Sequence, residues 1–259
     1  MKNEIITFGT NYKLNNGIKT IVKSAKNTSG TLTVIGVDLD RETVKYIEDN
    51  NGKCIDGRAL SEKHNIDLTL SPYTLKVIFY TLYCKKYTDS DNLFICDFTD
   101  VFFQKDIFKL IDDNKVTVHS ELKKIETCPT NSTWINTCFG SEIYNKIKHK
   151  NIINSGTFYG KRKNINNLLD NMCTEIIRAL SFCGNYLIID QPAMNKLVYE
   201  QPDIFEVRED NKVYNLAHNT DTEFNVKDSI ISLNNYESYV LHQYDVNEKL
   251  KTFIHEKVK

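Results

Sequence analysis

The sequence has few residues that interrupt regular structure and no excess of charge of either sign. Its 259 residues include only 10 glycines and 4 prolines, and no Pro/Gly/Ser-rich linker, internal repeat or low-complexity tract divides them. Lysine and arginine total 33 against 34 aspartates and glutamates, which leaves a net charge of -1. Proteins that neutralise many nucleic-acid phosphates need a clear cationic excess, so we expect no nucleic-acid partner. An anionic ligand would need a local arrangement of groups or a bound metal ion.

Long apolar runs and paired cysteine motifs are also missing. The longest mostly apolar stretch, near residues 75–84, is too short and too polar to span a bilayer, so we expect no transmembrane segment. The first residues carry an acid at Glu4 and do not have the pattern of a signal peptide. The seven cysteines form no CxxC pair, so we expect no structural zinc site. Scattered cysteines favour a reducing, cytoplasmic setting, which is the host cytoplasm if the protein is viral.

The composition that remains is typical of one globular domain. Hydrophobic residues make up 41% of the chain and charged residues 26%, which excludes general disorder. In the first half, short β-branched runs alternate with helical spacing, and Ser71-Pro72 is typical of a helix start. The expected elements are strands at 5–8, 32–37, 54–55, 93–96 and 116–118 and helices at 12–25, 41–49 and 74–87. Such alternation predicts an α/β fold with a mostly parallel sheet.

The second half has a less regular pattern, and no linker separates it from the first. We expect strands at 152–153, 157–159, 230–233 and 239–241, a short strand near Val213, and helices at 165–180 and 192–199. One continuous domain over residues 1–259 fits this pattern best.

The segment 93–104, which reads LFICDFTDVFFQ, concentrates chemistry at the end of a buried strand. It places Asp97 and Asp100 three residues apart between apolar runs. Carboxylates held together repel one another unless a proton or a cation joins them, and Mg²⁺ or Mn²⁺ takes one or two carboxylates plus substrate phosphates. The alternative is an Asx-turn in which Asp100 caps a helical turn. From this segment alone both interpretations stay open.

A second pair of acids, in Asp38-Leu39-Asp40, has a simpler explanation. It follows the expected strand at 32–37 and leads directly into the helical pattern at 41–49. Helix capping therefore explains Asp40.

Four motifs together resemble those of GT-A glycosyltransferases, in the order in which that family has them. The first is the DxxD segment at Asp97 and Asp100, a variant of the DxD metal motif. The others are Asn154-Ser155-Gly156, the helix start Asp190-Gln191-Pro192-Ala193-Met194-Asn195, which is similar to that of glycogenin-like enzymes, and Val240-Leu241-His242-Gln243-Tyr244-Asp245. The resemblance implies a GT-A (Rossmann-like) fold, with a mostly parallel central sheet, flanking helices and a small antiparallel C-terminal part.

The resemblance also implies an activity and a division of labour along the chain. It implies a metal-dependent glycosyltransferase of the hexosyltransferase type, which moves a sugar from a nucleotide-diphosphate sugar to a glycan or other hydroxyl acceptor. A UDP-sugar donor and retention of the anomeric configuration are favoured. Residues from about 1 to 120 would form the nucleotide-binding half, and residues from about 121 to 259 the sugar- and acceptor-binding half.

Carried over by position, the resemblance implies roles for individual residues. The metal, Mn²⁺ or Mg²⁺, would be held by Asp97, Asp100 and His242. The donor sugar would meet Asn154, Ser155, Gly156 and Gln191, and catalysis would involve Asp190 and Lys76. The strand order places the nucleotide near the end of the first strand, at Phe8, Gly9, Thr10 and Asn11, together with Asp97. The sequence departs from the family pattern at Lys76 and Val246, since the family usually has arginine at both positions. Lys249 would have to supply the positive charge that Val246 lacks.

Several of these residues have structural alternatives. Asn154-Ser155-Gly156 could form a turn, and Asp190-Gln191-Pro192 could cap a helix. If Asp190 is functional, it either stabilises an oxocarbenium-like transition state or acts as a base. We interpret the remaining histidines as structural: His64, His119, His149, His218 and His255.

Two other functions compete with glycosyl transfer. One is a Mg²⁺-dependent phosphohydrolase of the haloacid-dehalogenase type, although that chemistry uses acids two residues apart and near the N-terminus. The other is a catalytically silent module that binds nucleotide sugars or carbohydrates.

Overall fold

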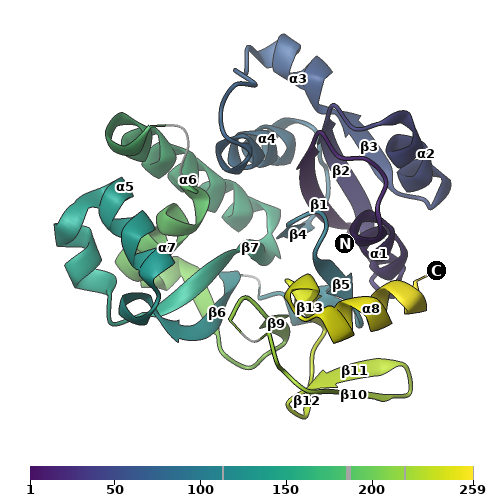
Figure 1. The fold of residues 1–259 in the computed structure, drawn as a ribbon. Coiled ribbons are helices and arrows are strands. Elements are labelled where there is room, and N and C mark those ends of the chain that lie inside the picture. Colours follow the sequence, from purple (N-terminus) through teal and green to yellow (C-terminus); the bar gives the residue numbers. More distant parts are fainter. Residues whose placement is uncertain (113, 185–187, 219, 259) are drawn as a thin grey trace.

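A computed structural model describes residues 1–112, 114–184, 188–218 and 220–258 (Figure 1). The strands are β1 (Asn3–Thr10), β2 (Thr31–Val37), β3 (Lys53–Asp56), β4 (Asn92–Cys96), β5 (Val101–Phe103), β6 (Val116–Lys124), β7 (Asn151–Lys161), β8 (Phe205–Arg208), β9 (Val213–Asn215), β10 (Phe224–Lys227), β11 (Ile230–Leu233), β12 (Tyr236–Glu237) and β13 (Val240–His242). The α-helices are α1 (Asn16–Ser24), α2 (Arg41–Asp49), α3 (Gly57–His64), α4 (Pro72–Lys86), α5 (Pro129–Ile147), α6 (Arg162–Cys183), α7 (Asp190–Glu200) and α8 (Glu248–Lys257).

A seven-stranded sheet in the order β3-β2-β1-β4-β7-β6-β8 forms the centre of the fold. Strands β1 to β4 pair in parallel, and β8 is parallel to β6, whereas β7 runs antiparallel to both of its neighbours. Two three-stranded sheets follow: β10-β11-β12, which is antiparallel, and β5-β13-β9, in which β13 is antiparallel to β5. The predicted α/β class, with a mostly parallel sheet and a small antiparallel C-terminal part, is confirmed.

Helices cover both faces of the central sheet (Figure 1). Successive residues of a strand point to opposite faces, so in β1 Ile6 joins the apolar cluster under α4, α6 and α7, while Ile5 joins the cluster under α1. The same alternation separates Ile95 from Phe94 in β4. Both faces of these strands are therefore buried, as expected for parallel strands between helix layers.

The elements of the first half lie close to their predicted positions. Ser71 caps α4 by accepting a hydrogen bond from the amide of Thr74, and Asp40 caps α2 by accepting one from Thr43. The predicted start of the first helix at residue 12 is wrong. Asn11 turns the chain at a φ of 57°, and α1 begins only after Asn15, whose side chain caps it by accepting from Ile18.

In the second half, the predicted strands at 152–153 and 157–159 are one continuous strand, β7. Asn154, Ser155 and Gly156 lie inside it, so the alternative of a turn at these residues is wrong. The sequence interpretation also missed α3, α5 and α8 and the short strands β5, β8, β10 and β12.

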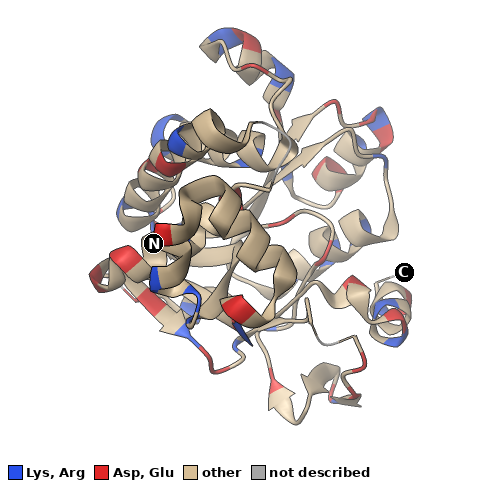
Figure 2. Cartoon of the chain, turned by 60° about the vertical axis from the view of Figure 1, so that its left-hand side comes forward, with Lys and Arg blue, Asp and Glu red and all other residues tan. Residues whose placement is uncertain are grey.

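Charged residues (Figure 2) and cysteines are spread over the whole fold. Basic and acidic residues are interspersed along the elements (Figure 2). The seven cysteines are free thiols, five buried and two half-buried. In the described ranges no helix combines the length and the hydropathy needed to cross a bilayer.

Candidate functional site

The carboxyl edge of the central sheet brings the first acids of the site into place. Asp97 directly follows β4, whose neighbour β1 runs parallel to it with Thr7 opposite Cys96. On the other side, the antiparallel strand β7 places Gly156 beside Asp97, and the amide of Asp97 donates a 2.9 Å hydrogen bond to the Gly156 carbonyl. The chain then turns, and Asp100 immediately precedes β5. Because a strand and not a helix follows Asp100, the alternative of a helix-capping Asx-turn is wrong.

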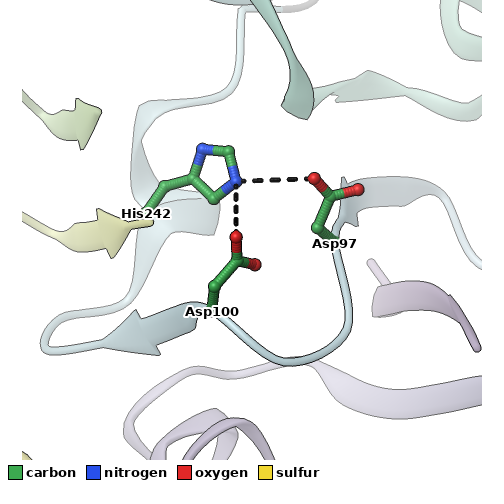
Figure 3. Close-up of side chains that lie close together, drawn as sticks. All are labelled: Asp97, Asp100 and His242. Carbon is green, nitrogen blue, oxygen red and sulfur yellow. Dashed lines mark ion pairs between the residues drawn. The ribbon is translucent and has the colours of Figure 1, made fainter. Parts of the chain in front are cut away.

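Strand β13 brings His242 to the two acids from a distant part of the sequence. It pairs antiparallel with β5, with His242 opposite Val101, and the amide of Gln243 donates a 2.8 Å hydrogen bond to the Asp100 carbonyl. Nε2 of His242 lies 3.6 Å from Oδ2 of Asp97 and 3.7 Å from Oδ2 of Asp100 (Figure 3). The three side chains each offer one ligand atom, and these atoms lie within 4.8 Å of one another.

A further residue fixes the orientation of the His242 ring. Strand β9 runs parallel to β13 with Asn215 beside His242, and Nδ1 of His242 lies 2.8 Å from Oδ1 of Asn215. An Nδ1–H donated to Asn215 leaves the Nε2 lone pair directed at the carboxylates, which is how metal-binding histidines are commonly held. Among the described residues, neither Nε2 of His242 nor Oδ1 of Asp100 has a hydrogen-bond partner, although both are buried. Two carboxylates and one imidazole with unused lone pairs fit a divalent cation.

The space around this Asp97–Asp100–His242 cluster depends on the absence of a side chain at Gly156. A Cβ atom at this position would lie 2.4 Å from Cε1 of His242 and 2.5 Å from Oδ2 of Asp97. Gly156 is not in the left-handed region of φ, so backbone conformation does not require glycine here. Glycine is required because any side chain at this position would overlap His242 and Asp97.

Lys76 links the cluster to the start of α7. Its Nζ lies 3.0 Å from Oδ1 of Asp97 and 2.7 Å from Oδ2 of Asp190, and Ser155 donates a 2.8 Å hydrogen bond to that same Asp190 oxygen. Asp190 is buried and does not cap its helix, because the N-cap position is Ile189. The capping alternative for Asp190 is therefore wrong. Its Oδ1 is buried without a hydrogen-bond partner in the described part of the chain.

The charges of the site shift one another's protonation. Burial alone would lower the pKa of Lys76, but Asp190 and Asp97 outweigh it and raise the pKa well above its usual range. Burial likewise opposes the charged form of Asp97, but Lys76 and His242 lower the pKa of Asp97 below its usual value. Burial raises the pKa of Asp100, and the negative charge of Asp97 raises it further. His242 lowers this pKa only in part, which leaves it at about 6. Against burial, Asp100 and Asp97 raise the pKa of His242. A bound cation would replace the protons that these groups otherwise share.

Two cavities adjoin the cluster and share four residues in their walls: Tyr73, Lys76, Asp97 and Asp100. The first cavity, of about 370 Å³, is otherwise lined by the end of β1 and the turn after β4, with Phe8, Gly9, Thr10, Tyr12, Pro72, Phe98 and Thr99. The second, of about 360 Å³, extends toward α5 and α7 and includes Glu121, Cys128, Thr130, Asn131, Trp134, Asn154, Ser155, Gly156, Ile188, Asp190, Gln191, Ala217, His218 and Gln243.

Most of the residues predicted for the site lie around these cavities, but Asn11, His242 and Lys249 line neither of them, and His242 is fully buried. Phe8, Gly9 and Thr10 line the first cavity, but Asn11 does not, since its amide is bonded to the Val37 carbonyl. Lys249 lines a separate pocket with Glu248 and other residues of the C-terminal region. The second pair of acids also lies elsewhere, since Asp38 pairs with Arg58 and Asp40 caps α2.

The predicted sugar-site residues Asn154 and Gln191 are held by hydrogen bonds to neighbouring residues. Asn154 accepts from the Gly156 amide at 2.7 Å and donates to Oε1 of Glu121 at 2.9 Å. Gln191 donates to Oδ1 of Asn131 at 2.9 Å. Asn195, which ends the Asp190–Asn195 motif, bonds both the amide and the carbonyl of Ile153 and so fixes α7 against β7.

Sequence reasoning missed three polar residues of the site. Asn215 carries no motif and is revealed only by the pairing of β9 with β13. Glu121 lies in β6, and His218 was interpreted as structural, although its Nε2 lies 2.9 Å from Oε2 of Glu121 in the wall of the second cavity. No sequence signal marked Glu121, because β6 reads VTVHSELKK and carries other polar residues beside it.

Comparison with known proteins places the fold. No family model and no curated protein matches this sequence. The structure is similar to an apo structure of WbbM, a bifunctional glycosyltransferase, with a TM-score of 0.59 and 13% sequence identity. The match covers 93% of this chain and 45% of that chain, so the present chain spans less than half of the protein it matches. At this identity the likeness concerns the fold, and it supports the predicted GT-A (Rossmann-like) class.

Proposed function

We propose that this chain is a metal-dependent glycosyltransferase of the hexosyltransferase type, which transfers a sugar from a nucleotide-diphosphate sugar to a glycan or other hydroxyl acceptor. The observation that carries this proposal is the position of Asp97 and Asp100, the two acids of the Asp97–Asp100–His242 cluster, in a wall shared by two cavities. A diphosphate bound at that wall would have its nucleoside in one cavity and its sugar in the other. Known proteins of the same fold, such as WbbM, include glycosyltransferases.

The first cavity suits a nucleoside. Its walls combine the Phe8 and Tyr12 rings with backbone at Gly9, and they come from the chain's first hundred residues. The walls of the second cavity come largely from residues 121–243. This distribution supports one domain with a nucleotide-binding half, from about residue 1 to 120, and a sugar- and acceptor-binding half beyond it. We favour UDP-sugars as donors.

Asp97, Asp100 and His242 would hold the cation. Carboxylates suit Mg²⁺ and Mn²⁺ equally, but an imidazole nitrogen favours Mn²⁺, so we expect Mn²⁺ to bind more tightly than Mg²⁺. When bound, the cation would act as a Lewis acid that stabilises the departing nucleoside diphosphate.

The chain's own residues would act beside the metal. Lys76, held between Asp97 and Asp190, lies where a phosphate oxygen approaching Asp97 would meet a second positive charge. Asp190 lines the sugar cavity, so its carboxylate lies close enough to a bound sugar to stabilise the positive charge that develops at the reacting carbon. Gly156 lets the backbone of β7 approach the donor sugar.

Retention of the anomeric configuration is the stereochemical outcome that we favour. Oδ2 of Asp190 is engaged by Lys76 and Ser155, which suits a fixed electrostatic role better than proton abstraction from the acceptor. An NMR measurement of the anomeric proton in the product, compared with that in the donor, distinguishes retention from inversion.

A donor screen tests the proposed function. The protein is incubated with Mn²⁺ and a panel of UDP-, GDP- and other nucleotide sugars, and the release of nucleoside diphosphate is measured. Slow hydrolysis or transfer of at least one donor is expected, and p-nitrophenyl phosphate is expected to remain intact. Turnover of p-nitrophenyl phosphate alone would indicate a phosphohydrolase. Mn²⁺-dependent nucleotide binding without turnover of any donor on broad acceptor panels would indicate a silent binding module.

A further inference from the structure

The second cavity is lined by more residues than those that we have assigned to the donor sugar. Its inner wall is formed by Asp97, Asp100, Gly156 and Asp190, which we have assigned to the metal and the donor. Its outer wall is made of residues from three other segments: Cys128, Thr130, Asn131 and Trp134 from the first turns of α5 and the residue before it, Ile188 before α7, and Ala217 with His218 after β9. None of these residues lines the nucleoside cavity. The outer wall is therefore available to a second ligand.

Trp134 is the main apolar surface of this outer wall. It is the one tryptophan in the sequence, and it lies half-buried in α5 rather than in the core. An indole offers a broad apolar face and a single N–H donor, which suits a ligand that has both apolar and polar surface. A sugar ring is such a ligand, because its C–H bonds form an apolar face edged by hydroxyl groups.

Glu121 and His218 supply polar groups beside it. Glu121 is buried, and its Oε1 accepts from Asn154 at 2.9 Å while its Oε2 lies 2.9 Å from Nε2 of His218. These contacts fix the carboxylate and the imidazole in the cavity wall. A few fixed polar groups next to an aromatic surface are typical of a specific small-ligand site.

The charge of the wall distinguishes between classes of ligand. The only Lys or Arg among the described residues that line the cavity is Lys76, and it is already paired with Asp97 and Asp190. A phosphorylated ligand would meet the Glu121 carboxylate with no free cation to offset it. The apolar residues of the outer wall are too few to bury a lipid chain. A neutral saccharide is not repelled by Glu121 and does not need a large apolar surface.

We propose that Trp134, Glu121 and His218 form a binding subsite for a neutral saccharide, which is the acceptor of the transfer reaction. The role of this saccharide as acceptor rests on the proposed function. The binding of a saccharide at these residues does not depend on it. The sugar ring lies against the Trp134 indole, and its hydroxyls bond to Glu121 and His218, so that one further hydroxyl is directed along the cavity toward Asp190.

The single tryptophan makes the subsite directly observable. Excitation selective for tryptophan reports only Trp134, in a sample that contains Mn²⁺ and UDP. The titrants are the methyl glycosides of glucose, galactose and mannose, their common disaccharides, and glucose 1-phosphate as the anionic counterpart. We expect at least one neutral saccharide to change the Trp134 emission saturably, and glucose 1-phosphate to bind more weakly than the methyl glycoside of glucose.

Three variants assign the effect to the subsite. We expect Glu121→Gln, followed by fluorescence, and Trp134→Phe, followed by calorimetry, to raise the dissociation constant of the bound saccharide about tenfold, as for the loss of one central contact. Asn136→Ala changes an exposed residue of the same helix that does not line the cavity, and its dissociation constant should equal that of the wild type. Thermal unfolding checks that each variant is folded.

The same samples separate the failure of this inference from the failure of the proposed function. If no saccharide changes the emission, if glucose 1-phosphate binds best, or if Trp134→Phe binds as the wild type does, the saccharide subsite is refuted. Calorimetry of UDP with Mn²⁺ tests the nucleotide site independently. Saccharide binding without UDP binding would refute the transferase and leave a carbohydrate-binding protein with the same subsite.

Discussion

At the scale of single residues, the site is held together by a lysine that pairs with two acids at once. Lys76 is largely buried, with 12% of its side chain exposed, and it contacts both Asp97 and Asp190. Removing one partner from a buried ion pair leaves an uncompensated charge, which usually costs more than the pair itself contributes. Lys76 is therefore both a structural residue and a candidate for phosphate binding.

Lys76→Met tests this double role. We expect the free energy of unfolding at neutral pH to fall by about 3–5 kcal/mol, because two carboxylates lose their cation. Lys76 lowers the pKa of Asp97, so its contribution is present above the ordinary carboxyl pKa and is lost as the pH falls below it. Urea unfolding at several pH values should thus show that the difference in the free energy of unfolding between Lys76→Met and the wild type becomes smaller at acidic pH. Lys76→Arg is the charge-preserving control, and an equal loss in that variant would contradict the role of charge.

The protonation of Asp100 gives the second prediction at this scale. The pKa of Asp100 is raised to about 6 and that of His242 is also raised, while a metal binds only the deprotonated forms. We expect the affinity for Mn²⁺ to weaken steadily as the pH is lowered through about 6. Calorimetry between weakly acidic and weakly alkaline pH measures this dependence.

Asp100→Asn provides its control. Without metal, the folded protein disfavours the ionised form of Asp100. The free energy of unfolding therefore falls as the pH rises from the pKa of Asp100 in the unfolded chain to its folded-state pKa of about 6, and it stays low at higher pH. The variant should therefore unfold at a higher temperature than the wild type at alkaline pH without metal, and should gain no stability from Mn²⁺. A pH-independent Mn²⁺ affinity in the wild type would contradict the prediction.

At the scale of elements, β7 organises the site more than any other strand. It contributes Asn154, Ser155 and Gly156, it lies between β4 and β6, and it receives α7 through Asn195. A rigid central strand can hold donor-binding groups and metal ligands at fixed separations, which a loop would not.

Gly156→Ala tests the clearance that β7 provides. The added methyl group would overlap Cε1 of His242 and Oδ2 of Asp97, so the ligand side chains must move apart. We expect at least a tenfold loss of Mn²⁺ affinity in calorimetry, with a loss of stability of about 1–3 kcal/mol. Gly160→Ala in the same strand is the matched control, because its Cβ would crowd the Lys115 carbonyl and not the cluster. If the control lost as much Mn²⁺ affinity, the effect would belong to the strand and not to the cluster.

The elements that could be predicted from the sequence are those with strong local signals. The caps at Ser71 and Asp40 and the apolar run of β4 define α4, α2 and the strand before Asp97 without reference to the rest of the chain. Helix α5 was missed because only four of its 19 residues are buried, which leaves no clear helical period. Residues 154–156 suggested a turn because asparagine, serine and glycine favour turns, whereas tertiary pairing with β4 and β6 overrides that preference.

The same holds for the site: residues in a local sequence motif could be predicted, and residues brought in from distant parts of the chain could not. The acids of the DxxD segment were apparent because they interrupt an apolar run. Asn215, Glu121 and Trp134 were not, because strand pairing brings Asn215 to His242, and the fold brings Glu121 and Trp134 to the second cavity, from positions without a motif.

At the scale of the whole molecule, the charge balance constrains how an anion can bind. The net charge is -1, basic and acidic residues are interspersed (Figure 2), and the wall between the two cavities carries Asp97 and Asp100. Without a cation, these carboxylates would repel a diphosphate, and no large positive field would compensate. The account therefore requires the metal to be the link between the protein and the nucleotide.

The binding of UDP with and without Mn²⁺, measured by calorimetry on the wild type, Asp97→Ala and Asp100→Ala, tests this claim most directly. We predict that the wild type binds UDP in Mn²⁺ and fails to bind it in a chelator, and that each variant loses at least tenfold in affinity with Mn²⁺ present. Near-normal Mn²⁺-dependent affinity in both variants, or equal UDP binding by the wild type in the chelator, would contradict the account.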